Sequence, residues 1–160
     1  MNIFISHKRE DQVKAMMVAD AFRKIGVEYY LDVLDNFVIN SGEELTSHIR
    51  EALNKCTDLL VVISPATRFS QWVPFEIGMA SQAYMPIANY MSEDVQLPEF
   101  LEFWPRLKTP NDIVKYVKIK RSTFIETDYE KRGPVLESWN IFGRQRDLSR
   151  FYAKLKQELL

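Results

Sequence analysis

The sequence predicts an α/β fold, a doubly wound parallel sheet with helices on both faces, and three observations lead to this prediction. Short apolar runs alternate with segments of helical periodicity over residues 2–90, the pattern of parallel strands joined by right-handed crossovers. The run from Asp58 to Ser64 is apolar almost throughout, as in a strand buried on both faces. With 160 residues, of which 46% are hydrophobic, the chain can bury one substantial core but not two.

The first strand, the first helix and the second strand follow in order from the start of the chain. Asn2 to Ser6 is a short apolar strand, and the polar cluster from His7 to Asp11 leads into the helix. Gly26 ends this helix, and Val27 to Leu31 forms the second strand, which stops at Asp32. The apolar positions of the helix, whose methionines are expected to fill the core, are Val13, Met16, Met17, Ala19, Ala21, Phe22 and Ile25.

The pattern in the next part of the chain predicts two more helices, one before and one after the central strand. Ser41 and Glu44 have the spacing of a capping box at the start of the second helix. The apolar run described above then forms the central strand. A helix is predicted from Trp72 to Tyr84, with Pro74 tolerated in its first turn, and a fourth strand from Tyr84 to Tyr90. The buried stripe of the second helix is expected at Leu45, Ile49, Ala52 and Leu53.

The pattern weakens towards the C-terminus. Prolines interrupt residues 91–110, where a short helix and a fifth, edge strand would fit. A helix is predicted from Asn111 to Lys120, then an irregular stretch that includes Gly143, then a terminal helix from Asp147 to Leu160. The large apolar residues expected to be buried in this part are Phe100, Phe103, Trp104, Ile113, Val114 and Val117.

Composition and motifs exclude several classes of function. The chain has 21 basic and 22 acidic residues, and this balance argues against nucleic acid as a partner. The single cysteine, Cys56, excludes an internal disulfide and is expected to be buried. His7 and His48 have no partners at metal-ligand spacing, so no metal is expected. Phosphate-binding glycine loops and hydrolase elbows are absent from the sequence. A secretory signal and an apolar window of membrane-spanning length are also absent, so the protein is expected to be soluble and cytoplasmic.

Polar side chains follow three of the predicted strands. Because ligands of open parallel sheets bind beyond the carboxyl ends of the strands, these side chains are candidates for one cleft. The basic residues after the first strand would suit a phosphate, or else form a solvated loop. Glu76 follows Trp72 by four residues, so it is either a carboxylate beside an aromatic wall or an exposed glutamate that favours the helix dipole. The candidates are Ser6 to Arg9, Asp32 with Asp35, and Ser64 with Ser70 to Glu76.

Four segments in order resemble the signature boxes of Toll/interleukin-1 receptor (TIR) domains. They are NIFISHKRED, YYLD followed by SGEEL, LLVVISP, and SQWVPFEIGMA. The resemblance covers about residues 1–90 and implies a flavodoxin-like sheet of five parallel strands in the order 2-1-3-4-5. It implies a TIR domain at residues 1–121 and leaves residues 122–160 as a C-terminal extension whose terminal helix packs on that domain.

The resemblance also implies an activity. Prokaryotic and some eukaryotic members of the family cleave the nicotinamide glycosidic bond of NAD+, and Ser70, Trp72 and Glu76 match their Ser-x-Trp-x-x-x-Glu pattern. By this resemblance Glu76 is the catalytic residue, and NAD+ is a substrate and not a cofactor. The residues implied to bind the substrate are Phe4, Ser6, His7, Lys8, Arg9, Asp32, Ser64 and Trp72.

As a short TIR protein of the stand-alone bacterial type, the chain resembles the enzyme of Thoeris anti-phage defence. This resemblance implies a cyclic or conjugated ADP-ribose signal as the product. That resemblance implies self-association through TIR–TIR contacts, a phage-derived trigger, and a downstream effector reached through the nucleotide. Two alternatives stay open. One is a non-enzymatic TIR module that recruits partner TIR domains. The other is a relative of the nucleoside 2-deoxyribosyltransferases, which also use a glutamate at a glycosidic bond.

Overall fold

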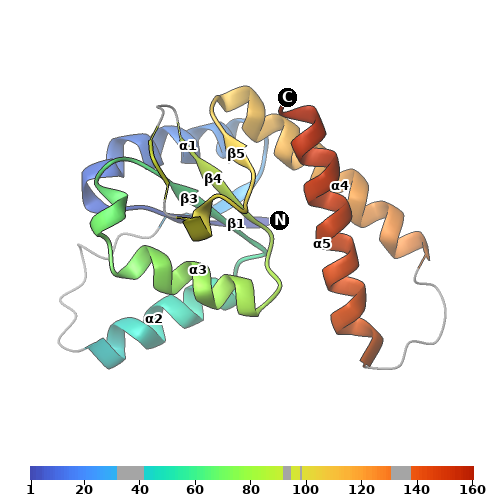
Figure 1. The fold of residues 1–160 in the computed structure, drawn as a ribbon, viewed down its shortest axis with the longest axis horizontal. Coiled ribbons are helices and arrows are strands. Elements are labelled where there is room, and N and C mark those ends of the chain that lie inside the picture. The colour runs from blue at the N-terminus through green and yellow to red at the C-terminus, as the bar shows by residue number, and fades with distance from the viewer. Residues whose placement is uncertain (32–41, 92–94, 98, 131–137) are drawn as a thin grey trace. The chain divides into compact units, whose positions relative to one another are not determined.

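A computed structural model describes residues 1–31, 42–91, 95–97, 99–130 and 138–160 (Figure 1). The chain divides into two compact units, Met1–Lys108 and Thr109–Leu160. The first unit holds the sheet and the second consists of two helices. Among the described residues, no helix is both long enough and apolar enough to cross a membrane.

The first unit is built on a five-stranded sheet in the order β2-β1-β3-β4-β5, and every neighbouring pair is parallel. This confirms the predicted fold class and strand order, with β3 at the centre. All five residues of β3 are buried, as the continuous apolar run predicted. The strands are β1 (Asn2–Ser6), β2 (Glu28–Leu31), β3 (Asp58–Val62), β4 (Ile87–Tyr90) and β5 (Arg106–Leu107).

Helices cover both faces of this sheet (Figure 1). α1 (Gln12–Lys24) lies on one face, and α2 (Gly42–Asn54) and α3 (Trp72–Gln82) lie together on the other. Because side chains alternate along a strand, neighbouring strand residues serve different faces. On the α2–α3 side, one buried cluster joins the strand residues Phe4, Leu59 and Val61 to Ile49 of α2 and Ile77 of α3.

The buried face of α1 differs from the one expected. The buried residues are Ala15, Val18, Ala19 and Phe22, at the helical spacing i, i+3, i+4, i+7. Two small alanines in this stripe allow the helix to lie close to the sheet. The large side chains Val13, Met16 and Met17 therefore point outward and are 72%, 57% and 64% exposed, so the prediction that these methionines fill the core is wrong. The predicted end of the helix is confirmed, because Gly26 follows it with a φ of 65°.

The two helices on the other face match their predictions. The buried residues of α2 are the expected stripe of Leu45, Ile49, Ala52 and Leu53, whereas its proposed cap, Ser41, lies outside the described residues. α3 begins at Trp72, so Pro74 falls in the first turn, where its missing N–H breaks no helical hydrogen bond.

A short 3-10 helix, η4 (Glu99–Leu101), and the edge strand β5 occupy the proline-interrupted region, as predicted. The expected burial of its aromatic residues is only partly correct. Asn89 Nδ2 on β4 donates to the carbonyl oxygen of Leu101 at 2.8 Å, which fixes Leu101 as the residue that enters the core. Phe100 and Phe103 consequently stay 47% and 67% exposed, while Trp104 is half-buried.

The second unit consists of α4 (Pro110–Glu130) and α5 (Ser138–Glu158), both longer than predicted. α4 continues past Lys120 because residues 111–132 contain no glycine or proline. α5 runs through Gly143, since one helical glycine costs only about 1 kcal/mol relative to alanine. The two helices pack through Tyr116 and Phe151, whose rings meet edge to face at 5.2 Å. Ile113 and Val117 are buried as expected, but Val114 is exposed.

Candidate active site

Glu76 is a buried carboxylate on the second turn of α3, with only 2% of its surface exposed. The interpretation of Glu76 as an exposed glutamate at a helix start is therefore wrong. Its Oε2 atom accepts a hydrogen bond from Oγ of Ser6, the last residue of β1, which is itself fully buried. Burying a charge without hydrogen-bond partners is costly, and this hydroxyl is one partner that stabilises the carboxylate.

The Ser6–Glu76 pair lies where the topology of the sheet favours a ligand site. β1 pairs with both β2 and β3, so the chain reverses its direction of winding at β1 and β3. Ser6 is aligned with Val61 of β3, which brings the carboxyl ends of these two strands to the same edge. Open parallel sheets bind their ligands at such a switch point. The structure thus brings the two residues separated by 70 positions together at this edge.

A second buried polar group joins the segments that follow β1 and β3. Asp11 is 4% exposed, and its Oδ2 atom accepts a hydrogen bond from Ser64 Oγ at 2.6 Å. Thr67 Oγ1 lies 3.4 Å from the same oxygen and accepts from the Ser64 amide at 2.9 Å. Sequence reasoning missed Asp11 and Thr67 as parts of this region. The available signal was an aspartate directly before a helix, which is ordinarily interpreted as a helix cap.

The residues after β1 form an ion pair and a turn at the surface. Lys8 Nζ lies 3.1 Å from Glu10 Oε1, and the Glu10 backbone amide, followed by Lys8, holds the pKa of Glu10 below its usual value. His7 Nδ1 lies 3.4 Å from the carbonyl oxygen of Ile5. Arg9 begins η1 (Arg9–Asp11) and is exposed. Lys8 already neutralises one carboxylate here, so an incoming phosphate would compete with Glu10.

Three other predicted substrate residues occupy different surroundings. Phe4 is fully buried among the core residues under α2 and α3, and its ring lies 5.3 Å from that of Tyr30. Trp72 is half-buried and packs edge to face on Phe75, with ring centroids 5.8 Å apart. Asp32 lies outside the described residues. The structure therefore groups Ser6 with Glu76 and Ser64 with Asp11, while Phe4 lies in the core and Trp72 packs on Phe75.

Ser70, the first residue of the Ser-x-Trp-x-x-x-Glu pattern, has a structural task. Its Oγ atom accepts a hydrogen bond from the Val73 amide at 3.2 Å, in the first turn of α3. The first amides of a helix have no partner within it, so this contact stabilises the start of α3. The pattern thus combines a capping hydroxyl with the carboxylate of Glu76 on one helix.

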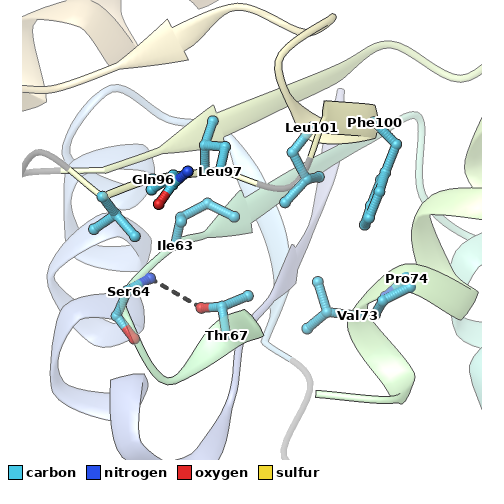
Figure 2. Close-up of a pocket in the computed structure, with 10 residues that line it drawn as sticks. Ile63, Ser64, Thr67, Val73, Pro74, Gln96, Leu97, Phe100 and Leu101 are labelled. Atoms are coloured by element: carbon cyan, nitrogen blue, oxygen red, sulfur yellow. Dashed lines mark hydrogen bonds between the residues drawn. The ribbon is translucent and has the colours of Figure 1, made fainter. Parts of the chain in front are cut away.

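A small pocket of about 70 Å³ opens next to Ser64 (Figure 2). It lies between the segment after β3, the start of α3 and η4, and Asp11, Ser6 and Glu76 are not among the residues that line it. Room of this size holds a few water molecules and not a dinucleotide. The pocket is lined by Ile63, Ser64, Thr67, Val73, Pro74, Val95, Gln96, Leu97, Phe100 and Leu101.

Neither a metal-binding cluster nor a reactive cysteine is found among the residues that the structure describes. No three His, Cys, Asp or Glu residues there could hold a metal ion together. Cys56 is buried as predicted, and burial, aided by nearby Asp58, raises the pKa of its thiol to about 11. A thiol with this pKa is almost entirely protonated at neutral pH and is a poor nucleophile.

Alkylation of Cys56 by iodoacetamide is expected to be at least about a hundredfold slower in the folded protein than in urea at pH 8. The ordinary pKa of 9.0 rises to about 11, so the reactive thiolate is about a hundredfold scarcer in the folded state, and burial slows the reagent further. Mass spectrometry of quenched samples measures both rates. Equal rates would mean that Cys56 is accessible and that its burial plays no part in its reactivity.

Comparison with known proteins identifies the family. The sequence model described as TIR domain matches residues 3–126, which is more than half of the chain. Among curated proteins no sequence matches. Among solved structures, the TIR domain of the Toll-related receptor TRR-2 from Hydra magnipapillata is 14% identical, with a TM-score of 0.55, over 80% of this chain and 94% of that one.

Two further solved structures share the fold. The 2-deoxyribosyltransferase from Bacillus psychrosaccharolyticus is 12% identical with a TM-score of 0.58, over 71% of this chain and 90% of that one. A metazoan TIR-STING receptor from C. gigas, solved with 2′,3′-cGAMP, is 22% identical with a TM-score of 0.54, over 71% of this chain and 38% of that one. At these identities the likeness extends to the fold alone, whereas the sequence match to the family model covers most of the chain. The chain belongs to the TIR domain family.

Proposed function

We propose that this TIR domain cleaves the bond between nicotinamide and ribose in NAD+, with Glu76 as the catalytic residue. The observation that supports the proposal is the buried Glu76 carboxylate, held by Ser6 at the switch point of the sheet. TIR domains include NAD-cleaving enzymes as well as signalling scaffolds. A scaffold has no need of a buried carboxylate at the ligand-binding edge of the sheet, because it acts through surfaces.

The reaction is a heterolytic cleavage. The electron pair of the bond between ribose C1 and the nicotinamide nitrogen leaves with nicotinamide, which becomes neutral, and C1 becomes an oxocarbenium-like centre. The negative charge of Glu76 stabilises this centre and orients the ribose hydroxyls. Water then adds to C1 and loses a proton, which gives ADP-ribose, whereas capture by an adenine nitrogen or a ribose hydroxyl gives a cyclic or conjugated product. Exclusion of water decides between these outcomes.

The other residues implied by the family resemblance have supporting tasks in this proposal. Lys8 and Arg9 attract the diphosphate of NAD+, and the diphosphate replaces Glu10 as the partner of Lys8. His7 lies on the same loop at the sheet edge, and Trp72 supports the nicotinamide end. Ser64 contributes to the rim, although its hydroxyl already bonds to Asp11.

Replacing Ser6 with alanine is expected to lower kcat for nicotinamide release by about 10- to 100-fold. A hydrogen bond to a charged group contributes about 1.5–3 kcal/mol, which is about one to two powers of ten in rate when it holds a catalytic carboxylate in place. Steady-state kinetics on purified protein measures the effect. The matched control is Ser81→Ala on the exposed side of α3, which should keep wild-type kinetics. A Ser6→Ala enzyme with unchanged kcat would show that Glu76 does not depend on this contact.

The activity itself is tested by mass-resolved chromatography of NAD+ incubated with the concentrated protein, with and without phage-infected lysate. Nicotinamide release identifies the enzyme, and the mass and retention of the second product separate hydrolysis from cyclisation. Free deoxynucleosides are incubated in parallel, because a 2-deoxyribosyltransferase shares the fold. Release of a base from nucleosides but not from NAD+ would replace the proposal by transferase activity. No release under any condition would leave the interaction module as the function.

The cellular role that fits this activity is a signalling enzyme of the Thoeris type in the cytoplasm. TIR domains self-associate, and contacts between protomers would complete the site, so specific activity should rise with protein concentration. The nucleotide product would reach a separate effector, and a phage-derived component would act as the trigger. A constant specific activity across the concentration series of the NAD+ experiment would argue against assembly of the site by self-association.

A further inference from the structure

Asp11 stands at the usual position of a helix cap but does not act as one. It immediately precedes α1, and its side chain makes no capping hydrogen bond to that helix. Its carboxylate instead crosses to the segment after β3, where Ser64 Oγ donates to it at 2.6 Å. The buried Asp11 carboxylate therefore bonds to a residue 53 positions away and not to the amides of its own helix, and this bond connects two loops.

The segment that Asp11 reaches is itself tightly organised. The Ala66 amide donates to Ser64 Oγ at 3.1 Å, and the Ser64 amide donates to Thr67 Oγ1 at 2.9 Å (Figure 2). The Ser64 hydroxyl thus accepts one hydrogen bond from the Ala66 amide and donates one to Asp11. The Ser64 amide closes a turn with Thr67. A displacement of Asp11 would consequently change the hydrogen bonds of the whole turn from Ser64 to Thr67. α3, which carries Glu76, begins only five residues after Thr67.

Two buried hydrogen bonds therefore join the β1–α1 part of the chain to the β3–α3 part. Ser6, at the start of the β1–α1 connection, bonds to Glu76, which lies beyond the far end of the β3–α3 connection. Asp11, at the end of the first connection, bonds to Ser64, at the start of the second. With β1 and β3 paired beneath them, the two connections cannot slide past each other without breaking a buried contact.

We propose that Asp11 is a positioning residue for Glu76: through Ser64 and Thr67 it fixes the β3–α3 connection so that the carboxylate stays against Ser6. The kinetic part of this inference rests on the proposed NAD+ cleavage, while the structural part does not. The hydrogen bonds of the Asp11 carboxylate go to Ser64 and Thr67 and not to Glu76. Its effect should thus appear in kcat and in the order of α3, and not in the affinity for the substrate.

The first test is made on the protein without substrate. Asp11→Ala is compared with wild type by hydrogen–deuterium exchange and by the 13C resonance of the Glu76 carboxyl group. Faster exchange in residues 64–76, with a shifted Glu76 resonance and unchanged exchange in α2, is expected. An equal increase in α2 and α3 would show a merely general loss of stability and would overturn the inference, as would no change. Asp11→Asn keeps an acceptor oxygen and should restore most of the wild-type behaviour.

The second test is kinetic. Asp11→Ala should lower kcat for nicotinamide release by about 10- to 100-fold, the usual cost of a misplaced catalytic group, and leave KM within about twofold. Adding Ser64→Ala should lower kcat by much less than the product of the two single effects, because both changes remove the hydrogen bond between Asp11 and Ser64. Two controls should keep wild-type kcat: Asp20→Ala, at a half-buried surface position of α1, and Ile49→Val, which weakens the core under α2. A raised KM at unchanged kcat would overturn the positioning role.

The two tests separate this inference from the proposed function. If the wild-type protein releases no nicotinamide, the proposed function fails, and the exchange and carboxyl measurements alone decide whether Asp11 positions Glu76. If nicotinamide is released but Asp11→Ala leaves kcat and the Glu76 resonance unchanged, the enzyme stands and the inference about Asp11 is wrong.

Discussion

Replacing Glu76 with glutamine is expected to lower the rate of nicotinamide release by about 10²- to 10⁴-fold, the usual effect of removing a charge that stabilises a transition state. The amide oxygen of glutamine still accepts the hydrogen bond from Ser6, so this link between α3 and β1 is kept. Only the negative charge opposite the developing oxocarbenium ion is lost. Nicotinamide is measured by chromatography over protein concentrations at which the wild-type rate is linear in time.

Two variants make this result specific to the position and charge of Glu76. Glu51→Gln removes a charge from an exposed position on α2 and should leave the rate unchanged. Glu76→Asp keeps the charge but shortens the side chain by one methylene, and it should lose most activity because the carboxylate no longer reaches Ser6. Urea midpoints of all variants show whether the fold is retained. A folded Glu76→Gln protein with more than half of the wild-type rate would remove Glu76 from the mechanism.

Replacing Phe4 with alanine is expected to lower the free energy of unfolding by about 3–5 kcal/mol, the usual cost of deleting a buried aromatic ring. The Phe4 side chain is fully buried and joins β1 to the cluster beneath α2 and α3. Its loss also removes the contact with the Tyr30 ring. Urea denaturation followed by circular dichroism gives the change. A loss of less than about 1 kcal/mol would contradict the role of Phe4 as a core residue, since truncations at the surface have effects of that size.

The same position tests the substrate contact that the family resemblance implies. Phe103→Ala is the matched control, since Phe103 is 67% exposed and its truncation should change stability by no more than about 0.5 kcal/mol. Phe4→Leu refills much of the volume and should retain the fold. If Phe4 touches NAD+ during the reaction, Phe4→Leu will raise KM while its stability stays near that of wild type. If Phe4 serves only the core, KM will not change.

The order of the elements and the family follow from the sequence alone. Apolar runs predicted the strands, because a strand buried on both faces carries apolar side chains at nearly every position. β3 is fully buried, as expected. The stripe of α2 and the glycine after α1 were equally local signals. Four boxes in order predicted a TIR domain, and the family match over residues 3–126 confirms it.

Which side of an element faces inward was decided by the tertiary structure. Met16 and Met17 are apolar and lie on a correctly predicted helix, yet they point outward because the sheet accepts the alanine-rich side of α1. The sequence also left Glu76 as either an exposed or a buried glutamate. Only the packing of α3 on the sheet, where Ser6 of β1 meets a residue 70 positions away, decided that it is buried. For the same reason the sequence did not predict that Asp11 bonds to Ser64. Periodicity and motifs report on neighbours within a turn or two, whereas the hydrogen bonds of a buried carboxylate depend on segments that only the folded sheet brings together.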